Sequence, residues 1–220
     1  MQPLVLHGLK CGIIPVNRYI KQILYVSALL SLFNSPISAQ DYLDEEKIDD
    51  VWTVTVNTYG ETVSDWSVVA SVNGKVTHGD RLRIRIPIRN LEGCSVGNTM
   101  TSFYTTNIDN EEEKAFIKNK IIPAELNGEE MSVKVLKAFP FFNVHLVYID
   151  MSWNKLENIK EYFNSSDEIS LLLKDRNNLE GITIINSDYF DVPFNNYSTK
   201  GLNSSLDRAQ TECKRLVNSL

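Results

Sequence analysis

The 220-residue sequence predicts a mainly β fold: an antiparallel β-sandwich or open barrel with short helices and a C-terminal helix. Residues 81–89 alternate Arg with Leu or Ile, the period of a strand that has one apolar and one polar face. Turn dipeptides such as Asn73-Gly74 separate further short runs of β-branched and aromatic residues. Strand patterns follow one another without regular helices between them, and this order favours antiparallel sheets.

The first 39 residues predict a signal peptide. They carry Lys10, Arg18 and Lys21 but no acid, then an apolar run at 23–33 and small residues at 37–39. This order of charge, apolar residues and small residues is typical of a secretory leader. A transmembrane anchor is the alternative, but the run covers only about half of the ~20 residues that a spanning helix needs.

Cleavage after Ala39 predicts a mature chain that begins near Gln40 and is periplasmic or secreted, with no membrane span left. The stretch before Arg18 is longer than a leader needs, which indicates either an extended leader or a later start codon. An export route also favours oxidised cysteines. We therefore expect Cys94 and Cys213 to form one disulfide; two buried thiols are the alternative.

Beyond the leader we expect an acidic lead-in at 40–50 and a single β-rich domain at 51–220. Asn127-Gly128 predicts a second tight turn, and Pro87 predicts an edge strand or a bulge because proline cannot donate to a ladder. The strands expected in this domain are 52–56, 65–72, 75–77, 81–89, 100–106, 131–139, 144–151, 168–174, 182–185 and 189–194.

Three segments predict helices. Residues 111–120 begin with three acids and end with two lysines, which suits the helix dipole. Residues 154–163 place apolar side chains at helical spacing. Residues 202–216 form a longer amphipathic pattern with Cys213 on the apolar stripe, and Asn203 or Ser204 is expected to cap its start.

Composition excludes several classes of function. The chain carries 22 Lys and Arg against 28 Asp and Glu, and the leader removes only positive charge. Nucleic acids and anionic lipids require concentrated Lys and Arg, so neither is an expected partner. A metal site needs three or four ligands, and His78 and His145 stand far apart without clustered cysteines. No nucleotide-binding glycine motif occurs after the leader, so no metal and no cofactor are predicted.

One motif points to catalysis. Gly93-Cys94-Ser95-Val96-Gly97 fits the G-x-S-x-G pattern, which presents a nucleophilic serine between a strand and a helix. Ser95 would need His145, with an acid such as Asp109 between them in the sequence. Residues 98–105 have no helical pattern, however, so a loop that supports the disulfide is the favoured interpretation.

Two weaker patterns remain. Ser152 and Lys155 fit S-x-x-K, but the later K-T-G element of the penicillin-recognising enzymes is absent. Residues 139–142, Phe-Pro-Phe-Phe, read either as an exposed contact patch or, more often, as core at a strand corner. The core interpretation is favoured.

The layout resembles the invasion-associated locus B family of alphaproteobacterial exported proteins. The resemblance lies in Trp52-Thr53-Val54 opening a β domain, a helix before residues 167–174, and a last strand that leads into the glycine–hydrophobic start of a helix at 201–209. The chain departs from the family in lacking its extra cysteines. The resemblance implies a non-enzymatic periplasmic or surface virulence protein linked to host-cell invasion, and it transfers no site residues.

The sequence therefore supports an exported, non-enzymatic domain that binds a protein or an envelope component. The alternative is a small serine hydrolase that uses Ser95. Labelling of Ser95 by an active-site serine probe would distinguish the two.

Overall fold

In the computed structural model, which describes residues 45–58, 65–77, 79–108, 110–174 and 188–220, one continuous antiparallel sheet dominates the chain. Within these residues the sheet has ten strands and is not closed, so the mainly β, antiparallel prediction is confirmed. The predicted leader lies outside the described residues. The strands are β1 (Glu46–Ile48), β2 (Trp52–Asn57), β3 (Ser67–Asn73), β4 (Arg81–Pro87), β5 (Val96–Thr105), β6 (Ile121–Leu126), β7 (Glu129–Phe141), β8 (Val144–Lys155), β9 (Glu168–Leu173) and β10 (Phe194–Ser198).

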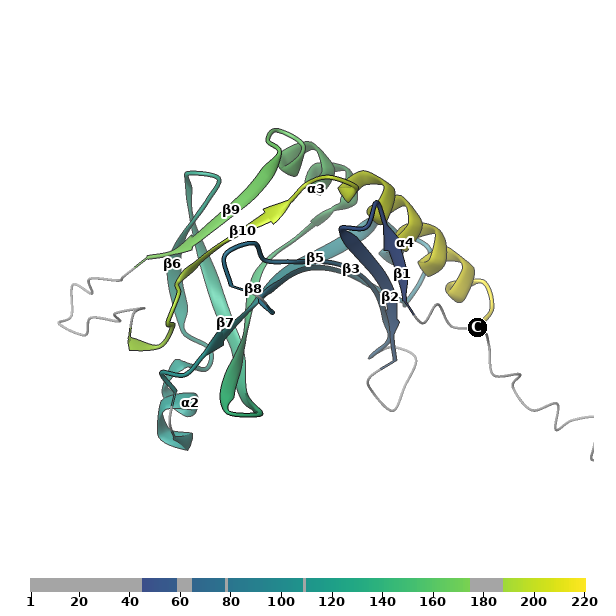
Figure 1. The fold of residues 1–220 in the computed structure, drawn as a ribbon. Helices are drawn as coiled ribbons and strands as arrows, with labels where there is room; N and C mark the ends of the chain where they lie inside the picture. The colour runs from purple at the N-terminus through teal and green to yellow at the C-terminus, as the bar shows by residue number, and fades with distance from the viewer. Residues whose placement is uncertain (1–44, 59–64, 78, 109, 175–187) are drawn as a thin grey trace, which may run out of the picture. The chain divides into compact units, whose positions relative to one another are not determined.

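The spatial order of the strands is β1-β2-β3-β4-β5-β8-β7-β6-β9-β10. Strands β1–β5 follow one another, and β8 then returns beside β5, so that the β6–β7 hairpin lies further out. Figure 1 shows the sheet bent into an arch, with helix α4 on its outer side. This bend gives the sheet an outer face that holds the core and an inner face that stays open.

The core forms on the outer face of the first strands. On β4, Leu82, Ile84 and Ile86 are fully buried, as the alternation predicts. Strand β10 reaches this core from the other end of the sheet: Tyr197 Oη lies 2.8 Å from Thr101 Oγ1. The sheet therefore curls over its own apolar face, which is why it combines features of a sandwich and of an open barrel.

Helix α4 (Leu202–Val217) packs on β2, β3 and β4 and completes this core. Its apolar stripe is buried as predicted, but its N-cap is Gly201 rather than Asn203 or Ser204. Gly201 has φ +81°, a left-handed conformation that suits glycine. The turn places Gly201 against Asp49: a Cβ added to Gly201 would lie 3.0 Å from Asp49 Oδ2.

The predicted cysteine pair meets in the structure. Cys94 lies in a short 3-10 turn, Gly93–Ser95, and Cys213 lies on α4. Their Cα atoms are 5.7 Å apart and the Sγ atoms are bonded. A disulfide requires a Cα separation within about 7 Å, and this pair meets that requirement. Gln210 Nε2 donates to Cys94 O at 3.1 Å and adds a second link between helix and turn.

Several local predictions are wrong because distant partners decide the backbone. Residues 75–77 are not a strand: Lys75 N donates to Asn196 O at 2.8 Å, so this segment binds β10 rather than returning along β3. Gly74 allows this approach, since an added Cβ would be only 2.3 Å from Asn195 Nδ2. The last strand is β10 at Phe194–Ser198, not 189–194. The predicted strand at 182–185 lies outside the described residues.

Two further differences concern strand edges. The acidic lead-in contains strand β1, which pairs with β2 and is held to α4 by an ion pair between Glu46 and Arg208 (2.7 Å). Pro87 lies on β4, an interior strand, rather than at a sheet edge. It is the last residue of β4 and faces Ser67, beyond the point where pairing with β5 ends at Arg85. A missing donor is tolerated there.

The two shorter helices begin or end inside their predicted ranges. Helix α2 spans Glu111–Ile117 and is capped by Asn110, whose Oδ1 accepts from Glu113 N. Helix α3 spans Leu156–Phe163, since the preceding residues 154 and 155 continue β8.

Candidate functional site

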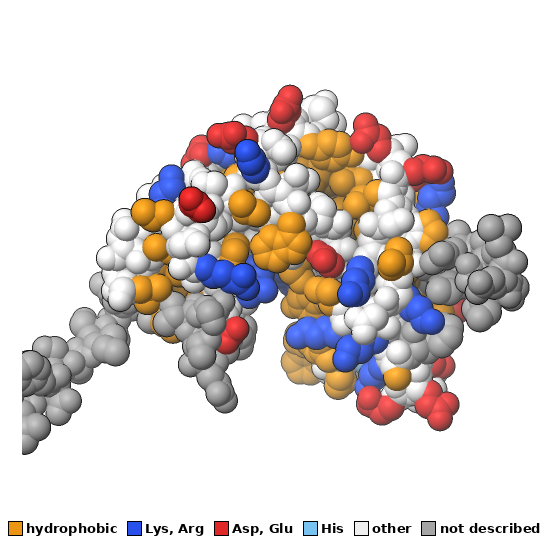
Figure 2. Space-filling view, turned by 180° about the vertical axis from the view of Figure 1, so that it is seen from behind, with side chains coloured by type: hydrophobic (Ala, Val, Ile, Leu, Met, Phe, Trp, Pro, Cys, Tyr) orange, Lys and Arg blue, Asp and Glu red, His pale blue; other side chains and the backbone are white. Residues whose placement is uncertain are grey.

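The inner face of the arch forms a groove with a volume of about 1130 Å³. It is lined by side chains from β2, β3, β4, β5, β7 and β8, on the face opposite the core. Figure 2 shows this hollow, with hydrophobic, Lys and Arg side chains on its walls. The groove is a large concave feature, and large concave sites are where ligands bind most often.

Three arginines of β4 face the groove because residues two apart share one face of a strand. Arg83, the central one, donates through Nη1 to Ser102 Oγ at 2.7 Å. Burial is the main cause that lowers the pKa of Arg83, but a guanidinium keeps its charge in proteins. Arg81 and Arg85 flank it in the groove lining. The strand therefore presents a row of fixed positive charges.

All three arginines are held by neutral groups. Arg85 Nε donates to Ser67 Oγ at 3.0 Å, and Arg81 Nε donates to Asn73 Oδ1 at 2.9 Å. Arg83 additionally lies over the ring of Tyr148, 5.2 Å from its centroid. Neutral acceptors orient a guanidinium without cancelling its charge.

The other wall of the groove is aromatic. Phe139 of β7 stacks on Tyr148 of β8, with ring centroids 5.5 Å apart and planes at 21°. Lys137 lies over both rings, at 5.2 Å from Phe139 and 5.6 Å from Tyr148. Such cation–π contacts hold charged groups on an apolar surface.

The charge of the groove is not neutralised within the described residues. No ion pair there joins Arg81, Arg83, Arg85 or Lys137 to a carboxylate. Asp150 lies nearby on β8, paired in register with Met100, and accepts from Asn98 Nδ2 at 2.6 Å. In a chain of net charge −6, four cations without acidic partners on one concave face form a local exception. Concave, low-dielectric sites of one sign attract ligands of the other sign.

The predicted triad is not assembled. Ser95 is exposed in the 3-10 turn next to Val96, and Val96 pairs with Lys155 at one end of β8. His145 lies near the other end, about 30 Å along the strand at ~3.3 Å per residue. Asp109 and the predicted turn residue His78 lie outside the described residues. Strand β5 follows Ser95 directly, so the helix that a nucleophile elbow requires is absent at this point.

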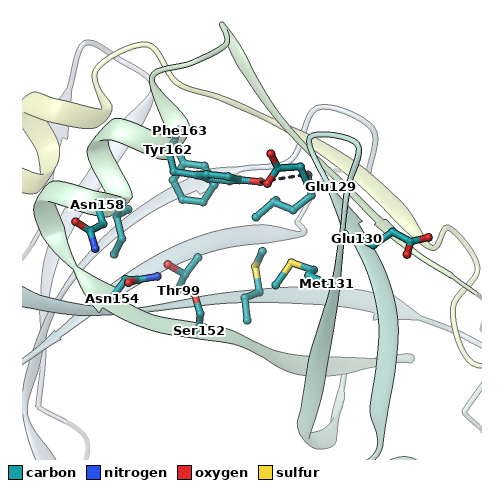
Figure 3. Close-up of a pocket in the computed structure, with 12 residues that line it drawn as sticks. Thr99, Glu129, Glu130, Met131, Ser152, Asn154, Asn158, Tyr162 and Phe163 are labelled. Atoms are coloured by element: carbon teal, nitrogen blue, oxygen red, sulfur yellow. Dashed lines mark hydrogen bonds between the residues drawn. The ribbon is translucent and has the colours of Figure 1, made fainter.

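The residues of the S-x-x-K motif are not brought together either, because the motif lies in an extended strand. Ser152 and Lys155 both lie on β8, where side chains three apart project to opposite faces. Ser152 instead lines a small pocket of about 200 Å³ between α3 and the β6–β7 hairpin (Figure 3). In this pocket Tyr162 Oη donates to Leu126 O at 3.0 Å and to Glu129 Oε2 at 3.1 Å. Partial burial, and secondarily Glu129, raises the pKa of Tyr162.

The aromatic run at 139–142 is exposed rather than core, which corrects the favoured interpretation. It forms the tip of the β7–β8 hairpin, where Phe142 is 91% exposed and has φ +55°. Phe141 lines the end of the groove, and its ring lies 5.6 Å from that of Tyr104. The tip therefore continues the aromatic wall out to the molecular surface.

Sequence reasoning found the arginine face of β4 but interpreted it as an ordinary solvated surface. Tyr148 and Lys137 were not singled out at all. The sequence signal for this face is local, since Arg81, Arg83 and Arg85 alternate with apolar residues. The pairing of β5 with β8 turns the face into a groove, and no local pattern shows that pairing.

Among the described residues, no cluster of three or more His, Cys, Asp or Glu side chains could hold a metal ion. In the same part of the chain, no helix is both long and apolar enough to cross a membrane.

Comparison of the chain with models of known protein families, with curated proteins and with solved structures found no match. The chain is therefore described by its fold and its groove alone: it is an open, arched antiparallel sheet with a basic and aromatic inner face.

Proposed function

We propose that this chain is an exported, non-enzymatic domain that binds an anionic component of the cell envelope in the groove of its arched sheet. The observation that carries the proposal is the row of Arg81, Arg83 and Arg85, held by neutral acceptors and facing a cavity of about 1130 Å³. Association with the envelope follows from the predicted leader, and a link to host-cell invasion follows from the family resemblance alone.

The electrostatics favour binding over a structural role for these arginines. An arginine that only stabilises a fold is commonly paired with a carboxylate, as Arg208 and Arg215 are with Glu212 on α4. Those pairs also lower the pKa of Glu212. The groove arginines lack such partners among the described residues, so an anion entering the groove would supply the missing charge. Arg also offers planar, bidentate recognition of carboxylate and phosphate groups.

A binding test uses two anionic probes on the mature protein: dextran sulfate, a polyanion, and dodecyl phosphate, an anion with an apolar tail. We expect at least one to bind, and Arg83→Met to reduce its affinity about tenfold or more, as loss of a charged hydrogen bond of ~1.5–3 kcal/mol implies. Arg89→Met is the matched control, since Arg89 is exposed and outside the groove lining. Failure of both probes to bind would refute the proposal.

Export is tested on the natural protein. We expect the secreted or periplasmic form to begin at Gln40, or within a residue or two of it, by N-terminal sequencing. Recovery of the intact chain from the cytoplasm would contradict export but would leave the groove proposal standing.

A further inference from the structure

We infer, resting on the proposed function, that the ligand is a single-headed anionic amphiphile: one acyl or alkyl chain with a carboxylate or phosphate head. The geometry points to the head at Arg83 and to the chain along the apolar side of the groove as far as Phe141. The proposal narrows the ligand from any anion to one chemical class, with a direction of binding.

The head subsite is the middle of the arginine row. Arg83 has a guanidinium with five N–H donors, and its hydrogen bonds to Ser102 Oγ and Arg81 O both use Nη1. Arg81 and Arg85 stand two residues away on either side, about 7 Å along the strand. One acidic head at Arg83 would therefore have a flanking cation on each side.

The tail subsite begins beside the middle of the arginine row, on the neighbouring strand β5. Met100 of β5 faces Arg83 across the strand pair, and it lines the groove together with Leu146 and Phe139. From the register of Met100 on β8 to the hairpin at Phe141 the strip runs about 20 Å, at ~3.3 Å per residue. A bilayer core of about 30 Å holds two acyl chains end to end, so one chain needs about 15 Å. The strip is long enough for one such chain.

The distribution of charge favours an amphiphile over a polyanion. A polyanion would need cations spaced along the whole groove, whereas three of the four lie together on β4. Lys137 is the fourth, and it lies over the rings of Phe139 and Tyr148 rather than among the arginines. The wall formed by β7 and β8 is otherwise mostly apolar, whereas β2 and β3 contribute Thr55, Asn57 and Ser71; the exposed hairpin tip continues the apolar part.

Isothermal titration tests the inference with four probes below their micelle concentrations: dodecyl phosphate, laurate, octyl glucoside and inorganic phosphate. We expect the two anionic amphiphiles to bind the wild-type protein, and the neutral amphiphile and the free anion to bind at least tenfold more weakly. Arg83→Met should lower the affinity for dodecyl phosphate about tenfold or more.

Two exposed phenylalanines give a matched pair for the tail. Phe141→Ser should weaken dodecyl phosphate several-fold, whereas Phe194→Ser should not, because Phe194 is similarly exposed (44% against 41%) but lies on β10 outside the groove lining. Circular dichroism checks that each variant folds. Both residues are already partly in water, so the fold should tolerate either change.

The outcomes separate the two proposals. The amphiphile inference would be overturned if octyl glucoside bound as tightly as dodecyl phosphate. It would also be overturned if inorganic phosphate bound as tightly as dodecyl phosphate. Binding of dextran sulfate that depends on Arg83, without binding of dodecyl phosphate or laurate, would also overturn the amphiphile and would support the anion-binding groove. Absence of binding by every anionic probe would overturn both.

Discussion

The two faces of strand β4 carry the main contrast in this molecule. On the outer face, Leu82, Ile84 and Ile86 are fully buried beneath α4 and the curled sheet. On the inner face, Arg81 is exposed and Arg83 and Arg85 are half-buried, and all three line an open groove. Successive residues of one short strand thus serve a closed core and an open cavity.

The contrast shows that stability and recognition are separable in this fold. Burial of Ile84 contributes hydrophobic free energy, about 2–3 kcal/mol for a fully buried side chain of this size. We expect the groove arginines to contribute less, because among the described residues none of them forms an ion pair with a carboxylate. Changes to the outer face should therefore alter stability, and changes to the inner face should alter binding.

The largest effect we expect comes from the bond that fastens α4 to the outer face. Cys213→Ser should lower the free energy of unfolding by about 4 kcal/mol, because the bridge closes a loop between residues 119 apart in sequence. Urea denaturation measures the loss, and a non-reducing peptide map should show Cys94 and Cys213 linked. The double variant Cys94→Ser/Cys213→Ser should lose no more than the single one. Two free thiols in the wild-type protein would contradict the prediction.

A smaller effect is expected from the core itself. Ile84→Ala should lower the free energy of unfolding by about 3 kcal/mol, from lost burial and the cavity left behind. Arg81→Ala, on the groove face of the same strand, is the matched control and should cost less than about 1 kcal/mol, because Arg81 and its partner Asn73 are both exposed. Urea denaturation of both variants at the same pH compares the faces directly. Equal losses would mean that the inner face stabilises the fold after all.

The third effect we expect depends on pH and comes from Asp80, a carboxylate at the start of the outer face of β4. Asp80 is buried; its Oδ1 accepts from Tyr104 N at 2.8 Å, and its Oδ2 from Asn195 Nδ2 at 2.9 Å. Burial raises the pKa of Asp80 to about 6, against an ordinary 3.8. Between pH 3.8 and about 6, the Asp80 carboxyl is therefore protonated to a greater extent in the folded state than in the unfolded state.

Stability from Asp80 is thus full below about pH 4 and falls as the pH rises to about 6, after which it stays level. We expect the wild-type free energy of unfolding, measured relative to that of Asp80→Asn, to decrease over this interval. Denaturation curves at pH 4, 5, 6 and 7 give the difference, and the comparison cancels other titrating groups. A difference that rises with pH would show that the two hydrogen bonds outweigh desolvation.

Much of the fold could be predicted from local pattern. The alternation at 81–89 located β4 and its two faces, and the spacing of Leu202, Leu206 and Ala209 located α4 and its buried stripe. The predictions of these two elements hold because the buried residues recur with the period of the strand or of the helix. The cysteine pair could be predicted for a different reason: Cys94 and Cys213 are the two cysteines that follow the predicted leader, and the expected export would favour their oxidation.

The groove could not be predicted, because it depends on contacts between distant residues. Residues 75–77 bind β10 through Asn195 and Asn196, a pairing that no local signal at Asn73-Gly74 shows. Likewise Tyr148 stands over Arg83 only because β8 pairs with β5. The arginine face looks like ordinary surface until the arch of the sheet makes it concave.

The place of α4 after the strands that it covers affects when the fold can form. A ribosome releases residues in order, so β2, β3 and β4 emerge long before the helix that covers them. Their apolar side stays uncovered until residues 202–217 have been made, and only then can Cys213 meet Cys94. We therefore expect the core over these strands to close late, because it needs contacts with α4, and long-range contacts of this kind are slow to form.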